Sequence, residues 1–576
     1  MMKWWGWGDP RFEFSIADRP EFWPWIIRTL NLKTTRSSPP VRREEISLKA
    51  PLRHEGFSRA LAARLRPDQI TDTEDQRLLH SYGKSYPDLF YVRKGIVRRP
   101  PDLVVYPESH DEVEAVVALA HEHGVCLVPF GGGTNIVGGI NPEEPVRMIA
   151  TLDMARMNRL LSLDPESNTA VIEAGALGPK LEEDLQARGY SLGHYPDSFE
   201  YSTLGGWLAT RSAGMQSDAY GKIEQMLVSV KLVTPSGTLT TRNTPASSAG
   251  PDLNRLVTGS EGVLGVITEA AMRVHKNPAA RDYRGVLFRT FEEALAAIQE
   301  LIESERRPSL IRLQDSAETE LASNMKPLTT GVKGFIQAQC KKFLKARGYH
   351  HPAIMIVGIE GDADRVNAVG KDVRRILKRH HGFDLGHEVG AVWQKDKFNL
   401  PYIRDFVMDR GIMCDVAETA AAWSDVLPLY KKVAAVMKER FEQDGTPGFI
   451  GCHISHTYTT GACVYFTYAC AQKAGAELEQ YYGFKKLITE TFLASKATLT
   501  HHHAVGREHR PWMEEEISKT GVTALKALKA GLDPAGIMNP GKLIPGDEPL
   551  CNWAQPTEPA AAAHEPRQTV AGDSAA

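Results

Sequence analysis

The sequence predicts an α+β fold built as more than one domain, on three observations. The chain has 576 residues, 42% of them hydrophobic, and one hydrophobic core does not extend over such a length. Short β-rich runs alternate with helical runs from about residue 100 to about 275, and a second mixed region follows from about 281 to 495. Several glycine-rich turns directly follow apolar runs, which is typical of strands that lead into ligand-binding loops.

The elements of the first region come in a regular order. Residues 103–106 (LVVY) are apolar and β-branched, and they predict a strand. Residues 111–123 predict a helix with Asp111 as its cap. Residues 125–128 (VCLV) predict a second strand. This strand, helix and strand favour an α/β or α+β domain.

The bulk composition does not favour a nucleic-acid partner, because the formal net charge is -3 and such binding requires a basic footprint. Seven cysteines without a CxxC pair favour reduced thiols. We find no run of about 18 apolar residues that predicts a spanning helix. The N-terminus lacks the apolar core of a secretory signal, and the C-terminus is not the peroxisomal Ser-Lys-Leu address. We therefore expect a cytoplasmic protein, peripheral at most on the inner membrane face.

The first glycine-rich turn is residues 129–135 (PFGGGTN), directly after a predicted strand. Three consecutive glycines allow a tight turn, and the exposed backbone N–H groups of such a turn suit a pyrophosphate. The motif matches neither GxGxxG nor the P-loop. Alone it is a weak signal, because glycine-rich turns are common.

Four further segments strengthen this signal: 195–206 (YPDSFEYSTLGG), 210–214 (TRSAG), 259–269 (GSEGVLGVITE) and 533–542 (DPAGIMNPGK). Their order and spacing resemble the FAD-binding domain of the vanillyl-alcohol-oxidase superfamily. The resemblance implies a vanillyl-alcohol-oxidase/PCMH-type FAD-binding domain with an inserted α+β cap domain. It also implies non-covalent FAD, since the first loop contains no histidine or cysteine.

The FAD contacts that the resemblance implies lie in four runs. They are Pro129, Phe130, Gly131, Gly132, Gly133, Thr134 and Asn135; Tyr195, Pro196, Asp197, Ser198, Phe199, Glu200 and Tyr201; Thr210, Arg211, Ser212 and Ala213; and Glu261, Gly262, Val263, Leu264, Gly265, Val266 and Ile267.

The histidine triplet His501, His502 and His503 (THHHAVG) is the most unusual run of the sequence. On an extended segment His501 and His503 share one face and His502 points to the other. Two imidazoles facing one pocket suit proton transfer near neutral pH. A metal site and a purely structural role are the alternatives, and no acidic or cysteine ligand stands at a suitable spacing for the metal. We therefore predict no bound metal.

Three further side chains are candidate functional residues. Tyr465 lies in a predicted strand (GACVYFTY), on the face opposite Phe466 and Tyr468; such a tyrosine is more often a core residue than a catalyst. Arg312 is a charge within an apolar run (SLIRL), so it requires an anionic partner from the protein or a substrate. Arg404 (YIRD) has a surface ion pair with Asp405 as its alternative role.

Together these motifs look like the alkyl-dihydroxyacetonephosphate synthase family, and the likeness extends from KWWGWG at residues 3–8 to about residue 543. The family pattern implies Tyr465 as proton donor and acceptor and the triplet as essential for activity. It implies Arg404 as a substrate-binding residue and Arg312 as critical for activity. The sequence departs from the pattern at His453, where the family carries an arginine, and at Phe130 and Asn135.

The implied reaction exchanges the acyl chain of acyl-dihydroxyacetonephosphate for a long-chain fatty alcohol. FAD forms a covalent substrate adduct, without net redox change, which divides a difficult displacement into two steps. The resemblance also implies a homodimer. The alternatives are an FAD-dependent 2-hydroxy-acid dehydrogenase or oxidase of the same superfamily, and a catalytically inactive flavin-binding scaffold on membranes.

The substrates that the resemblance implies carry long alkyl chains and reside in a bilayer. We therefore expect the enzyme to contact a membrane surface. Residues 326–347 combine apolar with basic side chains in an amphipathic pattern, and a solvated helix over the cap is the alternative. Five of the ten tryptophans lie within residues 1–50. Packing of this arm on the main body and contact with a membrane interface are the two alternatives for it.

The expected organisation has five parts. They are an N-terminal arm and helical segment (1–95), the FAD-binding domain (96–280), the cap or substrate domain (281–499), a C-terminal segment with the histidine triplet (500–545) and a disordered tail (546–576).

Overall fold

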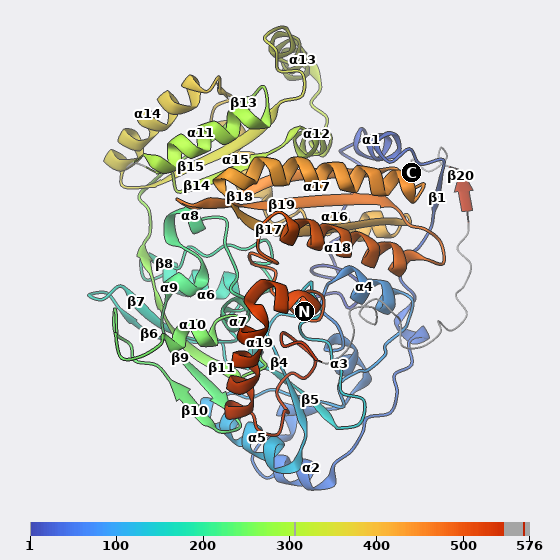
Figure 1. Ribbon diagram of the computed structural model, residues 1–576, viewed down its shortest axis with the longest axis vertical. Helices are drawn as coiled ribbons and strands as arrows, with labels where there is room; N and C mark the ends of the chain where they lie inside the picture. The colour runs from blue at the N-terminus through green and yellow to red at the C-terminus, as the bar shows by residue number, and fades with distance from the viewer. Residues whose placement is uncertain (1, 305–306, 547–567, 571–576) are drawn as a thin grey trace.

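The computed structural model describes residues 2–304, 307–546 and 568–570 (Figure 1). Two sheet-containing bodies are stacked along the long axis of the molecule. The lower body contains residues from about 50 to 276 together with the C-terminal segment, and the upper body is built around one large sheet. This mixed helix and sheet content confirms the predicted α+β class.

The described residues of the lower body contain two larger sheets and one pair of short strands. The four-stranded sheet has the order β2 (Ile70–Thr71), β3 (Leu103–Val105), β5 (Ile149–Asp153), β4 (Cys126–Phe130), with parallel β3–β5 and β5–β4 pairs. The five-stranded antiparallel sheet has the order β10 (Gly237–Thr240), β9 (Leu227–Thr234), β11 (Val266–Arg273), β7 (Thr169–Glu173), β6 (Leu160–Asp164). Short strands β8 (Tyr190–Ser191) and β12 (His275–Lys276) pair beside it.

Helix α5 (His110–His123) contacts strands of both sheets, because its apolar stripe shares one core with them. The prediction that Asp111 caps it is wrong. Ser109 is the cap, and its side chain accepts from the backbone N–H of Glu112. Asp111 lies in the first turn, where an acidic side chain favours the helix dipole.

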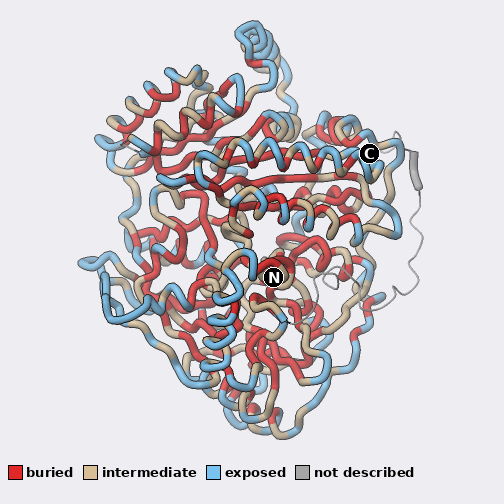
Figure 2. The backbone as a smooth tube through the Cα atoms, in the orientation of Figure 1, coloured by how far each residue is buried: buried red, intermediate tan, exposed pale blue. Residues whose placement is uncertain are grey.

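The upper body is a seven-stranded sheet in which each pair is antiparallel. Its order is β16 (Phe383–Asp384), β13 (Ala280–Phe288), β15 (Ala353–Gly361), β14 (Leu310–Gln314), β18 (Gly448–Thr457), β19 (Gly461–Ala471), β17 (Ile412–Ala422). Helices α11 (Phe291–Glu303), α14 (Ala363–Arg379) and α17 (Trp423–Gln443) cover its upper face (Figure 1). Their apolar residues form the largest core cluster with the sheet, and Figure 2 shows this buried interior.

The other helices surround these sheets. They are α1 (Phe22–Thr29), α2 (Glu55–Ala62), α3 (Glu74–Leu79), α4 (Tyr86–Arg93), α6 (Gly178–Gln186), α7 (Leu204–Thr210), α8 (Ser217–Tyr220), α9 (Ile223–Met226), α10 (Leu253–Val257), α12 (Ser316–Asn324), α13 (Gly331–Ala346), α15 (His387–Asp396), α16 (Tyr402–Met408), α18 (Glu477–Ala494) and α19 (Met513–Leu532). In the described residues no helix is long and apolar enough to cross a membrane.

Residues 537–539 and the described residues near the N-terminus pack against the bodies. Residues 537–539 run beside β4, where the backbone N–H of Leu127 donates to Ile537 and that of Asn539 donates to Leu127. Near the N-terminus, Trp7 is buried and its backbone N–H donates to Asp405 on α16. Most of the predicted disordered tail lies outside the described residues; 568–570 form β20 (Gln568–Val570), which pairs with β1 (Thr34–Arg36).

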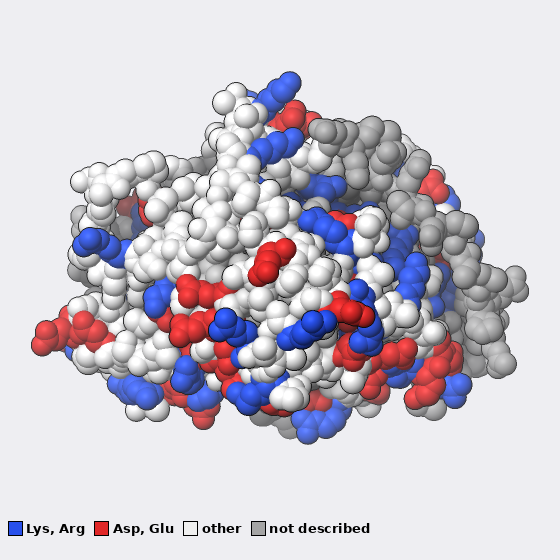
Figure 3. All heavy atoms as spheres, turned by 90° about the horizontal axis from the view of Figure 1, so that it is seen from below, with Lys and Arg blue, Asp and Glu red and all other residues white. Residues whose placement is uncertain are grey.

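The surface seen from below carries both signs of charge. Lysine and arginine side chains are interspersed with aspartate and glutamate over this face (Figure 3). Exposed ion pairs such as Arg66 with Asp68 contribute little to stability.

Candidate active site

One large cavity lies between the glycine-rich loops of the lower body and the sheet of the upper body. All residues of 129–135 line it, with Pro196, Asp197, Ser198, Thr210, Ser212, Ala213, Glu261, Gly262, Gly265, Val266 and Ile267. Arg312, Arg404, Tyr465, His502 and His503 line it from the upper body and the C-terminal segment. The fold therefore brings both sets of predicted residues to one cavity.

Seven of the predicted FAD contacts do not line this cavity: Tyr195, Phe199, Glu200, Tyr201, Arg211, Val263 and Leu264. Val263 and Leu264 are instead buried in the hydrophobic core of the lower body. The motif therefore mixes residues that face the cavity with residues that hold the loop. Further lining residues that the motif missed include Ser202, Thr203, Gly205 and Gly206.

The glycine-rich loop fits FAD because its backbone forms the wall of the cavity. A Cβ on Gly132 would lie 1.5 Å from the carbonyl oxygen of Tyr201, and one on Gly131 would lie 2.3 Å from Thr203 Oγ1. Gly133 has a φ of 70°, a conformation that favours glycine. The loop is packed so closely that only glycine leaves its N–H groups free to approach a pyrophosphate.

A row of three side chains crosses the upper sheet on its cavity face. Tyr465 on β19 lies directly opposite Glu418 on β17 and directly opposite His453 on β18. Residues opposite each other in a pair project to the same face, so the register brings all three together. Phe466 and Tyr468 lie in the core on the other face, as the alternation predicts.

The histidine triplet does not adopt the predicted extended form. Glu418 Oε1 accepts from the backbone N–H groups of His502 and His503 at 3.0 and 2.9 Å, and Oε2 accepts from that of His501 at 2.7 Å. Thr500 Oγ1 donates to the same carboxylate at 2.6 Å. The segment therefore bends around one carboxylate, and His502 and His503, rather than His501 and His503, line the cavity.

Buried Glu418 is the functional residue that sequence reasoning missed, and its side chain is fully enclosed. It lies 83 positions before His501, in an alanine-rich run without a motif. The only available signal was a lone carboxylate in a β-rich segment. Although burial favours the neutral form, the three histidines lower the pKa of Glu418 well below its usual range.

Burial also keeps the triplet imidazoles neutral. It lowers the pKa of His502 to about 3 and that of His503 to about 4, although Glu418 opposes this. Burial raises the pKa of Tyr465 well above its ordinary value. At neutral pH the phenol therefore holds its proton, and the neighbouring imidazoles are unprotonated.

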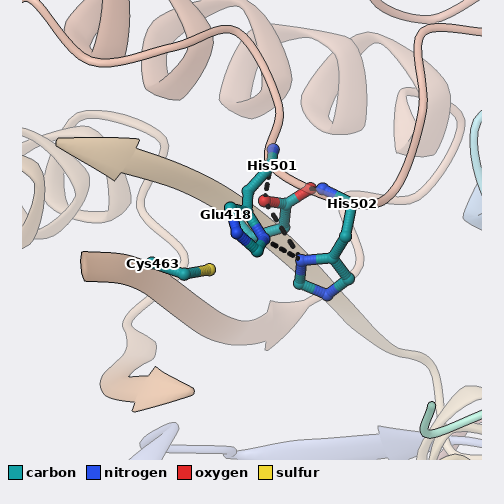
Figure 4. A group of neighbouring side chains, drawn as sticks. All are labelled: Glu418, Cys463, His501 and His502. Atoms are coloured by element: carbon teal, nitrogen blue, oxygen red, sulfur yellow. Dashed lines mark hydrogen bonds and ion pairs between the residues drawn. The ribbon is translucent and has the colours of Figure 1, made fainter. Parts of the chain in front are cut away.

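Glu418, Cys463, His501 and His502 surround one point, and one potential ligand atom of each lies within 4.8 Å of the others (Figure 4). Sequence spacing did not reveal this group, because β17 and β19 bring Glu418 and Cys463 to the triplet. The group resembles a metal site by composition. However, the Glu418 oxygens already accept four hydrogen bonds from residues 500–503, so proton transfer fits the group better.

The two predicted arginines have different surroundings. Arg312 contributes, with His453, to a lowered pKa of the buried Glu318, although burial opposes it; it therefore has an anionic neighbour in the protein. Arg404 Nη1 donates to the carbonyl oxygen of Lys84 at 2.6 Å. The alternative of a surface pair with Asp405 is wrong, because Asp405 turns to the N-terminal arm and lies 3.8 Å from Lys3 Nζ.

Comparisons with known proteins agree with this geometry. Residues 101–242 match a family model described as an FAD binding domain, and residues 277–543 match the C-terminal domain of FAD linked oxidases. An alkyldihydroxyacetonephosphate synthase from Dictyostelium discoideum is 41% identical, covering 94% of this chain and 93% of the relative. The chain belongs to the alkyldihydroxyacetonephosphate synthase family.

Solved structures support this membership. An alkyldihydroxyacetonephosphate synthase matches with a TM-score of 0.83 at 38% identity, over 94% of this chain and 99% of that chain. A p-cresol methylhydroxylase matches with a TM-score of 0.62 at 16% identity, over 86% of this chain and 98% of that chain, which shows the fold alone. The vanillyl-alcohol-oxidase/PCMH-type architecture and FAD as cofactor are thus confirmed for this synthase family member.

Proposed function

We propose that the protein is an alkyldihydroxyacetonephosphate synthase, which exchanges the acyl chain of acyl-dihydroxyacetonephosphate for a long-chain fatty alcohol. The observation that carries the proposal is the cavity that joins a flavin-type glycine loop to Tyr465 and to His502 and His503. A 2-hydroxy-acid dehydrogenase shares the loop but does not require this proton-transfer group, so it is the less supported alternative.

The polar residues of the cavity have different roles in the proposed reaction. Arg404 binds the phosphate of the substrate, since a guanidinium and a phosphate form charge-assisted hydrogen bonds. Tyr465 Oη holds a proton, and the neutral imidazoles of His502 and His503 accept it, so the three together can move a proton to and from the reacting carbon. Non-covalently bound FAD supplies covalent catalysis without net redox change.

The apolar end of the cavity accommodates the long chains. Phe22, Trp25 and Ile26 of α1 line it together with Leu321 of α12 and Phe449 of β18. These side chains form an apolar wall beyond the polar group, and alkyl chains bind there through the hydrophobic effect.

We also propose that α13 contacts a membrane surface. The helix projects from the molecule in Figure 1, and Val332, Phe335 and Ile336 are 76%, 66% and 54% exposed. Lys341 and Lys345 are exposed on its other side, so the helix is amphipathic and basic. It follows α12 in the chain, whose Leu321 lines the apolar end of the cavity, and this supports a role of α13 in the uptake of lipid substrates.

The purified, flavin-loaded protein would be incubated anaerobically with palmitoyl-dihydroxyacetonephosphate and hexadecanol. We expect alkyl ether and palmitate by mass spectrometry, without an electron acceptor. Absence of the ether, with the flavin bleached by a 2-hydroxy acid, would contradict the proposal and favour the dehydrogenase. Sedimentation of the same sample would test the expected homodimer.

A further inference from the structure

A second carboxylate–imidazole pair lies beside Tyr465, with its imidazole on the strand that flanks β19 opposite the one that carries Glu418. His453 Nδ1 donates to the carboxylate of Glu318 at 2.9 Å, and Thr467 Oγ1 donates to the same carboxylate at 2.8 Å. His453 and Glu318 are 1% and 4% exposed. A buried carboxylate in this position fixes the tautomer and orientation of the ring.

This pair is directed at the reaction centre. The ring of His453 stacks on Tyr465 with centroids 4.5 Å apart and an interplanar angle of 19°, and His453 lines the cavity. Because Glu318 takes the Nδ1–H, the neutral ring carries its lone pair on Nε2. His453 thus offers a base to the cavity from β18, while His502, which lies 3.5 Å from Glu418 of β17, has its ring 5.9 Å from that of Tyr465.

The pair also lies toward the apolar end of the cavity. Glu318 is on α12, one turn before Leu321, and Phe449 is on the same face of β18 as His453, four residues earlier. Both Leu321 and Phe449 line the apolar wall. The head of a long chain that occupies this end is therefore close to His453, whereas the triplet is held by Glu418 of β17.

We infer that His453, oriented by Glu318, is the catalytic base that takes the proton of the incoming alcohol; this inference rests on the proposed function. The exchange breaks the bond between the substrate C1 and the carboxylate oxygen and forms a bond between C1 and the alcohol oxygen. The alcohol proton moves to His453 Nε2 and then to solvent, the fatty acid leaves as carboxylate, and no electrons are transferred overall. Glu318 is a positioning residue.

The test separates the two halves of the exchange. In His453→Ala we expect palmitate release by the flavin-loaded enzyme before alcohol is added to remain within about 3-fold of wild type. Ether formation from hexadecanol should fall by about 10²-fold, the usual contribution of a general base. With 2,2-difluorohexadecanol, a more acidic alcohol, much of the loss should be recovered, because this alcohol needs a weaker base.

Three results would overturn the inference while wild type still makes ether: unchanged ether formation, equal loss of both halves, or no recovery with the acidic alcohol. Absence of ether from wild type would instead reject the proposed function. The matched control is His275→Ala. His275 also stacks on a tyrosine, Tyr220, at 4.4 Å, but does not line the cavity, and we expect its removal to leave both halves unchanged.

Glu318→Gln tests the positioning role. Glu318 on α12, Arg312 on β14 and Asp197 in the lower body act electrostatically on His453, and Tyr465 on β19 stacks on its ring. Removing the charge of Glu318 should lower ether formation about 10-fold and move the acid limb of its pH profile to lower pH, since this carboxylate favours the protonated ring. A lower rate with an unmoved pH profile would show that Glu318 acts only structurally.

Discussion

At the scale of single residues, the chemistry of Tyr465 depends on its neighbours. The ring lies between the imidazoles of His453 and His502, with centroid separations of 4.5 and 5.9 Å. Burial raises its pKa well above the ordinary value, so ionisation alone does not activate it. In the proposed mechanism the imidazoles of His502 and His503 therefore have to carry the proton that the phenol exchanges.

Tyr465→Phe removes one oxygen and keeps the stacked ring. We expect ether formation to fall by about 10² to 10⁴-fold, the range typical of an acid–base group, while flavin content and the melting temperature stay near wild type. Product analysis measures ether formation, flavin absorbance measures the flavin content, and thermal unfolding gives the melting temperature. Retention of most of the activity would exclude the phenol as a proton carrier.

Glu418→Gln tests the carboxylate that shapes the triplet. The amide presents N–H groups where one backbone N–H of residues 501–503 now donates, so a buried donor loses its acceptor. We expect a loss of about 1–3 kcal/mol in the free energy of unfolding together with reduced activity. Chemical denaturation would measure the loss.

The control is Glu490→Gln on α18. Its side chain is 50% exposed and lies 3.9 Å from Lys486, and exposed pairs of this kind contribute little. Equal stability of the two variants would show that Glu418 does not hold the triplet.

At the scale of elements, the three strands β17, β19 and β18 bring the polar groups together. Their register places Glu418, Tyr465 and His453 in one row, although 35 positions separate Glu418 from His453 in the sequence. Sequence pattern predicted the strand around Tyr465 and the face on which it lies. It could not predict which residues lie opposite, because register depends on the neighbouring strands.

Helix α13 is the element for which a membrane contact can be measured. Lys341→Glu, Lys342→Glu and Lys345→Glu together should weaken co-sedimentation with anionic liposomes by about 100-fold or more, at about 1 kcal/mol for each lysine near the surface. The matched control reverses Lys431, Lys432 and Lys438, which are exposed on α17. Equal binding of both variants would reject α13 as the contact.

At the scale of the whole molecule, the buried imidazoles link stability to pH. His502 and His503 have folded-state pKa values of about 3 and 4, below the value of about 6.5 for an unfolded chain. Their contribution to stability is therefore complete above about pH 6.5 and is lost as pH falls toward the folded values. As the pH falls through that window, each of the two histidines lowers the free energy of unfolding by up to about 1.4 kcal/mol per pH unit.

The double variant His502→Asn/His503→Asn should consequently lose less stability than wild type between pH 7 and 5. Buried carboxyl groups with raised pKa values, such as Asp218 at about 6 and Glu261 at about 7, titrate in the opposite direction. They are present in both proteins, so they cancel in the comparison. Urea unfolding at three pH values measures the difference, and parallel losses would contradict the prediction.

The sequence by itself determined the chemistry that local residues carry. The glycine-rich loops, the triplet and the strand of Tyr465 are contiguous motifs, and local backbone preferences together with the family resemblance were sufficient to predict the FAD-binding fold and most of its cavity. Only the tertiary structure decided the shape of the triplet, the role of Glu418 and the second pair of His453 with Glu318. These depend on contacts between residues 47 to 135 positions apart, which strand register and packing create and which no local periodicity encodes.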